Sequence, residues 1–349
     1  MDKHKIRVGI SHGDINGVSY EIIIKALLDH RIFEFCTPIV YGSSKVAAYH
    51  RKALNINNFS LNSISKPEDA NIKRANIINC VDDNIKVEFG KSTEAAGKSS
   101  YAALERATQD LKDSKIDVLL TAPINKNNIQ SENFNFPGHT EYLKDKFEAE
   151  DVLMMLVSDV MRIGVVTGHV PISKVPEKIT EGNILRSLRL MNKSLIEDFR
   201  IRKPKIAVLG LNPHAGDNGV IGEEENKIII PTIAKARNEN ILAIGPYPAD
   251  GFFGSNNFKE FDAILAMYHD QGLAPFKAIS FDSGVNFTAG LPIVRTSPAH
   301  GTAYDIVGKN IASPSSFRQA LFLACDIYKN RKEYKNLIKN SIINDSSHK

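Results

Sequence analysis

The sequence predicts an α/β protein built from parallel βαβ units with helices on both faces of a sheet. Short runs rich in β-branched residues alternate with longer amphipathic segments along the chain. Several of the short runs end in a glycine-containing loop, which is typical of buried parallel strands. The length of 349 residues, with 42% hydrophobic and 24% charged residues, allows two domains or one large α/β unit.

Eight segments carry the strand pattern, because each is a short apolar run bounded by turn residues. The predicted strands lie at 6–10, 38–42, 117–123, 152–156, 162–168, 205–211, 241–245 and 262–268. Apolar residues that recur with the helical period predict helices between them. The predicted helices lie at 20–30, 100–114, 184–200 and 228–239. The stretch from about 55 to 91 is less regular, which indicates a peripheral insertion.

Composition argues against several classes of protein. The net charge is +4, acidic and basic residues are interspersed, and no basic block resembles a nucleic-acid-binding arm. The sequence contains neither an 18-residue apolar run nor an apolar leader. Three widely spaced cysteines, Cys36, Cys80 and Cys325, form neither a disulfide framework nor a zinc cluster. We therefore expect a cytoplasmic protein that binds neither nucleic acid nor a membrane.

Three histidines follow predicted strands at the point where each strand ends, namely His169, His214 and His269. Because the carboxyl ends of parallel strands meet at the ligand-binding edge of a sheet, we expect the three imidazoles to converge. Three imidazoles form a divalent-metal site that leaves positions open for a substrate. The alternative is that these histidines cap or hydrogen-bond locally, and their spacing matches no known metal motif.

The loops after the other strands indicate an anionic ligand. His139 and Thr140 follow Gly138 and open a predicted helix, where an imidazole, a hydroxyl and free backbone N–H groups can hold a phosphate. The alternative is that Thr140 serves only as the helix N-cap. The glycine-flanked loop 11–21 offers a similar anion site, with a bare turn as its alternative. No GxGxxG follows a strand, so the usual dinucleotide fingerprint is missing.

The segment 268–314 combines many glycines with single polar and charged side chains. Its candidate functional residues are His269, Asp270, Lys277, Asn286, Arg295 and His300. Arginine binds a carboxylate or phosphate with two hydrogen bonds, and lysine acts as a point charge or a tunable base. A solvated charged face is the alternative, but these charges stand singly among apolar residues and glycines.

From about residue 6 to about residue 326, the chain resembles the 4-hydroxythreonine-4-phosphate dehydrogenase (PdxA) family. The resemblance rests on the motifs GHTEYL, TAPINK, GLNPHAGDNGVIGEEE, GPYPAD, YHDQGLAPFK and GVNFTAGLPIVRTSPAHGTAYD. The segment HGTAYDIVGKNIASP also resembles the adenosine-binding loop of isopropylmalate and isocitrate dehydrogenases. The first loop lacks two prolines and a glycine of the family pattern, and Gly168 stands where threonine is common.

The resemblance implies two α/β/α domains with a central cleft, the non-Rossmann fold of isocitrate and isopropylmalate dehydrogenases, which would explain the missing GxGxxG. The first domain would span approximately 1–125 plus 300–349 and contain both termini. The second domain, approximately 126–299, would carry the metal ligands and the dimer interface. The active site would lie at the interface of a homodimer, with one of the three histidines supplied by the partner subunit.

The resemblance also implies roles for individual residues. The metal ligands would be His169, His214 and His269. The substrate would be bound by His139, Thr140, Lys277, Asn286 and Arg295. Catalytic roles would fall to Lys277, Asp250 and Asp270. The base would be Lys277 or a metal-linked water, and the two aspartates would orient the imidazoles beside the metal or ligate it directly. The nicotinamide cofactor would be contacted by His300, Gly301 and Thr302.

The implied reaction is the oxidation of 4-phosphooxy-L-threonine by NAD or NADP with one divalent metal per site, either zinc, magnesium, manganese or cobalt. The product, 2-amino-3-oxo-4-phosphooxybutanoate, decarboxylates to 3-amino-2-oxopropyl phosphate in the biosynthesis of pyridoxal 5'-phosphate (vitamin B6). The main alternative is a related dehydrogenase of 4-phosphoerythronate or 4-phosphothreonate. More distant alternatives are an aromatic dihydrodiol dehydrogenase, a phosphotransacetylase-like enzyme and a non-catalytic metal- or anion-binding protein.

Overall fold

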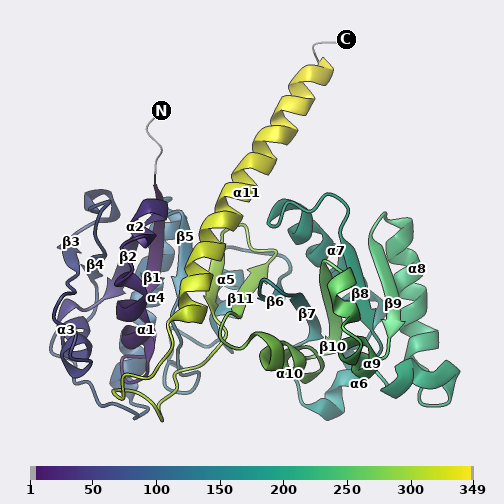
Figure 1. Ribbon diagram of the computed structural model, residues 1–349, viewed down its shortest axis with the longest axis horizontal. Helices are drawn as coiled ribbons and strands as arrows, with labels where there is room; N and C mark the ends of the chain where they lie inside the picture. Colours follow the sequence, from purple (N-terminus) through teal and green to yellow (C-terminus); the bar gives the residue numbers. More distant parts are fainter. Residues whose placement is uncertain (1–4, 347–349) are drawn as a thin grey trace. The chain divides into compact units, whose positions relative to one another are not determined.

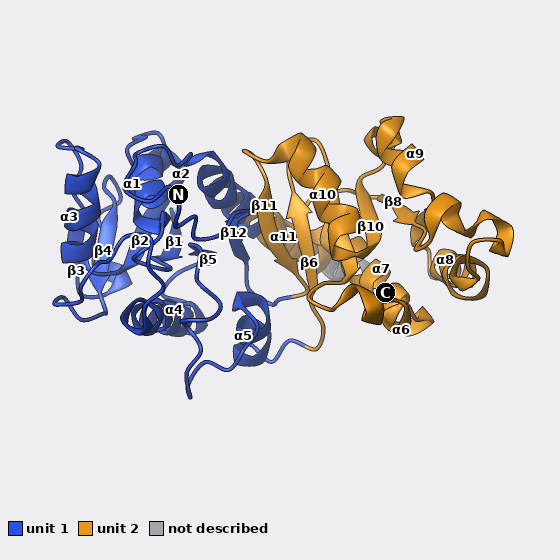
Figure 2. Ribbon diagram, turned by 90° about the horizontal axis from the view of Figure 1, so that it is seen from below, with its two compact units in different colours: residues 1–149, 291–328 blue, residues 150–290, 329–349 orange. Residues whose placement is uncertain are grey.

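The computed structural model describes residues 5–346, and residues 1–4 and 347–349 of the predicted domains lie outside this range. The chain divides into two compact units, which Figure 2 distinguishes by colour. Unit 1 comprises Met1–Ala149 and Leu291–Tyr328, and unit 2 comprises Glu150–Gly290 and Lys329–Lys349. Both units are α/β, which confirms the predicted fold class. None of the helices within residues 5–346 has the length and apolar content needed to cross a bilayer.

Unit 1 contains a parallel sheet with the strand order β3-β4-β2-β1-β5-β12. Its strands are β1 (Ile6–Ser11), β2 (Cys36–Gly42), β3 (Asn62–Ile64), β4 (Asn76–Asn79), β5 (Val118–Thr121) and β12 (Arg295–Pro298). Its helices are α1 (Ser19–Leu27), α2 (Ile32–Phe35), α3 (Ser44–Ala53), α4 (Glu94–Lys112), α5 (His139–Lys146) and the first part of α11 (Ser315–Ser346). Helix α4 covers one face of the strands, and α1 and α2 cover the other (Figure 2).

Unit 2 contains a mixed sheet with the order β11-β6-β7-β10-β8-β9. Its strands are β6 (Leu153–Val157), β7 (Arg162–Thr167), β8 (Lys205–Leu209), β9 (Leu242–Tyr247), β10 (Ala263–Tyr268) and β11 (Val285–Ala289). Its helices are α6 (Val175–Lys178), α7 (Glu181–Glu197), α8 (Ile230–Asn238), α9 (Ala249–Gly254) and α10 (His269–Ser280) (Figure 1). Strands β7, β10, β8 and β9 are parallel, so their carboxyl ends lie at one edge. The three candidate ligand histidines follow the first three of them.

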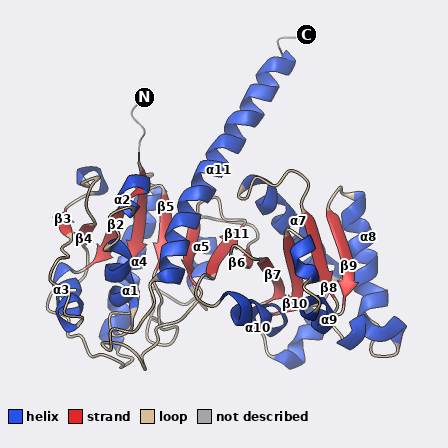
Figure 3. Cartoon of the chain, viewed as in Figure 1, coloured by secondary structure: helices blue, strands red, loops and turns tan. Residues whose placement is uncertain are grey.

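The structure contains all eight predicted strands and all four predicted helices (Figure 3). The segment 55–91 is peripheral, as expected, but it is part of the sheet: its strands β3 and β4 form the outer edge of the sheet of unit 1. Strands β11 and β12 were not predicted, since both lie in the glycine-rich segment 268–314 and contain polar residues. Strand β6 pairs antiparallel with both β7 and β11, so the expectation of a purely parallel sheet is wrong for unit 2.

Residues 291–299, which include β12, lie in unit 1 and not in the predicted second domain. The division of the chain also differs from the predicted domains at residues 126–149, which likewise lie in unit 1. The reason is aromatic packing on α4. Tyr142 of α5 is fully buried, stacks on Phe134 with ring centroids 5.3 Å apart, and donates a hydrogen bond to Glu105 of α4. Likewise, residues beyond 328 belong to unit 2, where Arg331 pairs with the buried Asp198 at 2.5 Å.

Two histidines are buried in unit 1 on either side of Tyr20. The rings of His12 and His50 each lie 5.3 Å from the ring of Tyr20, and neither imidazole is more than 1% exposed. His50 Nε2 lies 2.8 Å from the carbonyl oxygen of Ile15, and His12 Nε2 lies 3.1 Å from that of Ser99. Burial lowers the pKa of each histidine from 6.5 to about 4.

We expect these histidines to make the protein acid-labile. The unfolded state binds more protons than the folded state between pH 6.5 and 4, so the free energy of unfolding falls as the pH falls through this window. Each histidine contributes a loss of about 1.4 kcal/mol per pH unit, or on the order of 3 kcal/mol at pH 4. Urea denaturation at pH 7.5 and pH 5 measures the loss, and His50→Gln should flatten it.

The control is His30→Gln, because His30 is exposed and lies in the same unit. That variant should keep the acid sensitivity of the wild-type protein. Equal pH slopes for wild type and His50→Gln would contradict the assignment.

Candidate functional site

The candidate metal ligands lie in unit 2, on the loops that follow β7, β10 and β8. His169 comes two residues after β7, and His269 follows β10 directly as the first residue of α10. The ring centroids of His169 and His269 are 6.0 Å apart. Since a metal–nitrogen bond is about 2.1 Å, two imidazoles on one ion have centroids roughly 5 to 6 Å apart. The pair therefore fits two ligands of a single ion.

His214 lies in an unusual turn after β8. Five consecutive residues, His214 to Asn218, adopt left-handed backbone angles with φ between 43° and 81°. The left-handed conformation costs roughly 1–2 kcal/mol for each residue other than glycine, and only Gly216 is a glycine here. The His214 side chain is exposed. The surrounding structure must stabilise this turn, and it thereby fixes where His214 is presented.

Within residues 5–346 of one chain, no group of three or more His, Cys, Asp and Glu side chains is arranged to hold a metal ion. Among the described residues, the histidine pair is thus not joined by a third candidate ligand. Asp270 contacts one histidine of the pair, because His269 Nδ1 lies 2.6 Å from Asp270 Oδ1. Asp250 is exposed in the first turn of α9. The donor set suits a borderline divalent metal such as zinc, with one or more positions left for other ligands.

A second group of predicted residues meets in unit 1 around Arg295. This arginine begins β12, is 3% exposed, and donates from Nε and one terminal nitrogen to Thr121 Oγ1 at 3.0 and 2.7 Å. His139 is the first residue of α5, is 9% exposed, and its Nε2 is buried with no hydrogen-bond partner in the described chain. A buried polar atom without a partner is costly, and a ligand that binds there removes the cost.

The charges around His139 favour an anion. Burial, together with the positive charges of Arg295 and Lys126, lowers the pKa of His139 well below 6.5. Burial also lowers the pKa of Arg295 to about 10, with Glu141 acting in the opposite direction. The first turn of α5, which holds Thr140, presents backbone N–H groups and the positive end of the helix dipole. The sequence located Thr121 and Lys126 only as part of the motif TAPINK at a strand end and predicted no role for either.

Two further substrate candidates lie in unit 2. Lys277 is exposed on α10, eight residues after His269 and therefore about 12 Å further along the helix axis. Asn286 lies on β11, and its Oδ1 is buried without a hydrogen-bond partner in the described chain. An unsatisfied amide oxygen is ready to accept a hydrogen bond from a ligand.

The cofactor candidates form part of a loop in unit 1 that contacts the first loop of the chain. The carbonyl oxygen of Thr302 accepts a hydrogen bond from Val18 N at 3.0 Å, and Tyr304 donates to Asp14 Oδ2 at 2.7 Å. A Cβ atom built on Gly301 would meet nothing within 4 Å, so the backbone there is open to a ligand. His300 is half-buried next to it.

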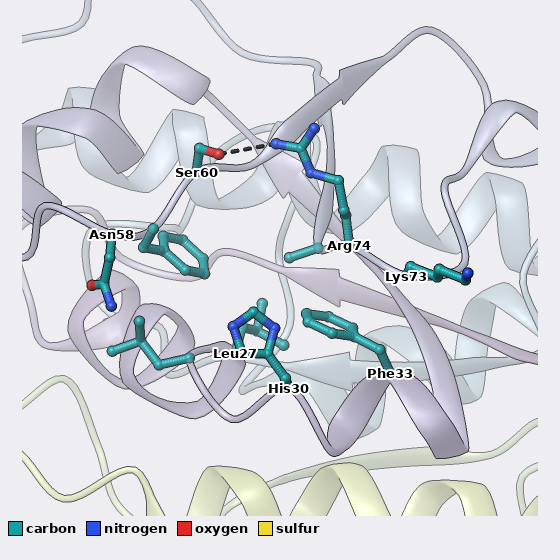
Figure 4. A pocket seen from close by; sticks show the side chains of 10 residues that line it. Leu27, His30, Phe33, Asn58, Ser60, Lys73 and Arg74 are labelled. Carbon is teal, nitrogen blue, oxygen red and sulfur yellow. Dashed lines mark hydrogen bonds between the residues drawn. The ribbon is translucent and has the colours of Figure 1, made fainter.

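Figure 4 shows a small pocket of about 120 Å³ elsewhere in unit 1. Leu27, His30, Phe33 and Phe59 line it, and Arg74 donates a hydrogen bond to Ser60 Oγ across it. None of the predicted site residues lines this pocket. It therefore shares no lining residue with either group described above.

Solved structures with this fold define the class of the protein. The chain superimposes on a 4-hydroxythreonine-4-phosphate dehydrogenase from Klebsiella pneumoniae with a TM-score of 0.81 and 30% identity, over 94% of this chain and 99% of that one. A protein of the same name from Bacteroides thetaiotaomicron is 52% identical over 337 residues, 96% of this chain and 92% of the relative. The protein is therefore an enzyme of the oxidoreductase class.

A match over most of the sequence identifies the family. Residues 34–324 match the family model described as pyridoxal phosphate biosynthetic protein PdxA, and the chain belongs to this family. A further relative, from Oceanobacillus iheyensis, is provisionally named a D-threonate 4-phosphate dehydrogenase. It is 38% identical over 94% of this chain and 99% of its own length. The predicted family and enzyme class are confirmed, whereas the roles of individual residues stay predictions.

Proposed function

We propose that this enzyme oxidises 4-phosphooxy-L-threonine to 2-amino-3-oxo-4-phosphooxybutanoate with NAD or NADP, in the biosynthesis of pyridoxal 5'-phosphate. The observation that carries the proposal is the buried group in unit 1, where Arg295 and the unpartnered Nε2 of His139 lie in a positively charged environment. Such a group suits a phosphate. The 52% identity to a protein of that name supports the same substrate.

Three residues would bind the phosphate. The planar guanidinium of Arg295 would donate to the phosphate, and Thr121 fixes its orientation by accepting hydrogen bonds from Nε and one terminal nitrogen. A phosphate near His139 would raise the pKa of the imidazole, so that Nε2 becomes a donor. Thr140 and the backbone of the first turn of α5 add neutral donors. The rest of the substrate would be held by Lys277 and by the amide of Asn286.

The metal would be held by His169 and His269 of one chain and by His214 of the partner subunit. Two observations support a shared site: the pair lies 6.0 Å apart, and no third ligand joins it within the described part of one chain. The protein would therefore be a homodimer with residues of both subunits in each site. When bound, a zinc, magnesium, manganese or cobalt ion supplies Lewis acidity that lowers the pKa of the substrate hydroxyl. Asp270, and more remotely Asp250, would orient the imidazoles.

The remaining residues would position the redox partners. Lys277 would accept the proton of the substrate's secondary hydroxyl while the hydride on the same carbon passes to the nicotinamide. His300, Gly301 and Thr302 would contact the adenosine half of the cofactor. The β-keto acid product then loses carbon dioxide to give 3-amino-2-oxopropyl phosphate.

A second candidate substrate is a phosphorylated four-carbon sugar acid, which differs from phosphooxythreonine by a hydroxyl in place of the amine. The 38% identity to the relative from Oceanobacillus iheyensis favours considering it. We expect metal-dependent reduction of NAD or NADP with 4-phosphooxy-L-threonine. With D-threonate 4-phosphate or 4-phosphoerythronate, kcat/KM should be at least about a hundredfold lower, because the groups that bind the substrate amine would lose their partner at a cost of about 3 kcal/mol.

Absorbance of the reduced cofactor measures all three substrates under identical conditions, with a chelator-treated sample as the control. A preference for either sugar acid would contradict the proposed substrate and keep the reaction type. No turnover with any of them would contradict both.

A further inference from the structure

A single glutamine joins the segments that carry two of the candidate metal ligands. Gln271 lies on α10, two residues after His269. Its Oε1 accepts a hydrogen bond from Met267 N at 2.7 Å, and its Nε2 donates to the carbonyl oxygen of Gly210 at 2.6 Å. The amide thus connects the end of β10 to the loop after β8, which continues to His214.

The same connection extends to β7. Thr167, two residues before His169, donates from Oγ1 to the carbonyl oxygen of Met267 at 2.8 Å. Both backbone groups of Met267 are therefore bonded by side chains of neighbouring elements, and Met267 itself is fully buried. The three strand ends that carry the candidate ligands are linked by one continuous series of hydrogen bonds within unit 2.

A buried glutamate holds the loop on the other side of Gly210. Glu225 is 2% exposed, and its Oε1 accepts from Leu211 N at 2.7 Å and from Asn212 N at 2.8 Å. Its Oε2 accepts from Asn212 Nδ2 at 2.9 Å. A Cβ atom on Gly216 would lie 2.6 Å from Oε2, so the left-handed turn fits against the carboxylate only with glycine there.

We propose that Gln271 and Glu225 are positioning residues that fix the loops carrying His169, His214 and His269 before the metal binds. The inference rests on the proposed function, because that function makes the three histidines metal ligands. Neither side chain contacts a histidine ring in the described contacts, and both act on the backbone. A carboxylate cannot replace the Gln271 amide, which donates and accepts at once, and an amide cannot replace the Glu225 carboxylate, which only accepts.

The test uses the isosteric variants Glu225→Gln and Gln271→Glu of the full chain. The zinc dissociation constant is measured by competition with a chromophoric chelator, and hydrogen exchange of residues 210–222 is measured in metal-free protein. We expect zinc affinity to fall about 10- to 100-fold in each variant, as for partners that orient metal ligands elsewhere. Exchange in 210–222 should become faster in both, since the backbone N–H groups of this loop lose their restraint.

The matched control is Glu223→Gln, because Glu223 lies two residues before Glu225, is 64% exposed and pairs only with Lys227 among the described contacts. It should keep both the affinity and the exchange of the wild type. Thr167→Val is a milder variant in case the others unfold, and it should weaken zinc binding without loosening 210–222.

Unchanged zinc affinity in folded Glu225→Gln and Gln271→Glu would overturn the inference, whether or not exchange increases. Weaker zinc binding with unchanged exchange of residues 210–222 in Glu225→Gln and Gln271→Glu would overturn it as well, because the effect of these two variants would not pass through the loop. Wild-type protein that binds no zinc would instead overturn the proposed metal site itself, and the inference with it.

Discussion

Replacing His214 with alanine is expected to abolish stoichiometric metal binding and to lower turnover by more than about a hundredfold, because loss of a group that merely orients a ligand already costs up to that much. His214 is exposed, so its truncation removes no core packing. The free energy of unfolding of the metal-free protein should therefore stay within about 0.5 kcal/mol of the wild type. Elemental analysis of the purified protein and the dehydrogenase assay measure the two effects.

Mixed dimers test whether the site is shared between subunits. Co-expression of His214→Ala with His269→Ala would restore one intact site in each mixed dimer, and so about a quarter of wild-type activity if subunits pair at random. Co-expression of His169→Ala with His269→Ala is the control, because both lesions fall in the pair that one chain contributes. Normal metal content in His214→Ala would contradict the ligand assignment, and absence of complementation would contradict the shared site.

Replacing Arg295 with methionine is expected to raise KM for the phosphorylated substrate by about 10- to 100-fold, since each charge-assisted hydrogen bond contributes roughly 1.5–3 kcal/mol. The same variant should be no less stable than the wild type. Burial lowers the pKa of Arg295 to about 10, so its charge opposes folding by an amount on the order of 3 kcal/mol. A residue that weakens the fold and strengthens binding is characteristic of a functional site.

The substrate without its phosphate, 4-hydroxy-L-threonine, separates two readings of this effect. If Arg295 binds the phosphate, Arg295→Met leaves kcat/KM for this analogue unchanged. Equal losses with both substrates would contradict the phosphate assignment and point to the carboxylate. Arg106→Met is the matched control in unit 1, because Arg106 pairs with Asp110 on α4 and should affect neither substrate.

The acid sensitivity expected from His12 and His50 is independent of both variants, because it concerns folding and not the site. The sequence predicted no role for either histidine, since His12 is only one residue of the glycine-flanked loop 11–21 and His50 lies outside the candidate sites. Only their burial beside Tyr20 makes them titrate at low pH.

The sequence predicted the parts of the fold that depend on local pattern. The strands before His169, His214 and His269 are mostly buried apolar runs, and each run is followed by a polar loop or helix start. Both features are visible in the sequence, so the strands and the histidines after them could be located. The pattern missed β11 and β12, because their short segments carry Asn286, Arg295 and threonines that look like loop residues. The domain limits implied by the resemblance placed residues 126–149 in the second domain, and nothing local in the sequence shows that Tyr142 packs on α4.

By itself, the sequence determined the α/β class, the family resemblance and the set of candidate ligands, because each of these depends on residue type and order along the chain. Only the tertiary structure decided which candidates meet: His169 with His269, and Arg295 with Thr121 and His139. The hydrogen bonds of Gln271 and Glu225 likewise could not be predicted from the sequence. These contacts join residues that are far apart in sequence. How deeply a side chain is buried, and which charges surround it, depend on the folded chain and cannot be read from local pattern.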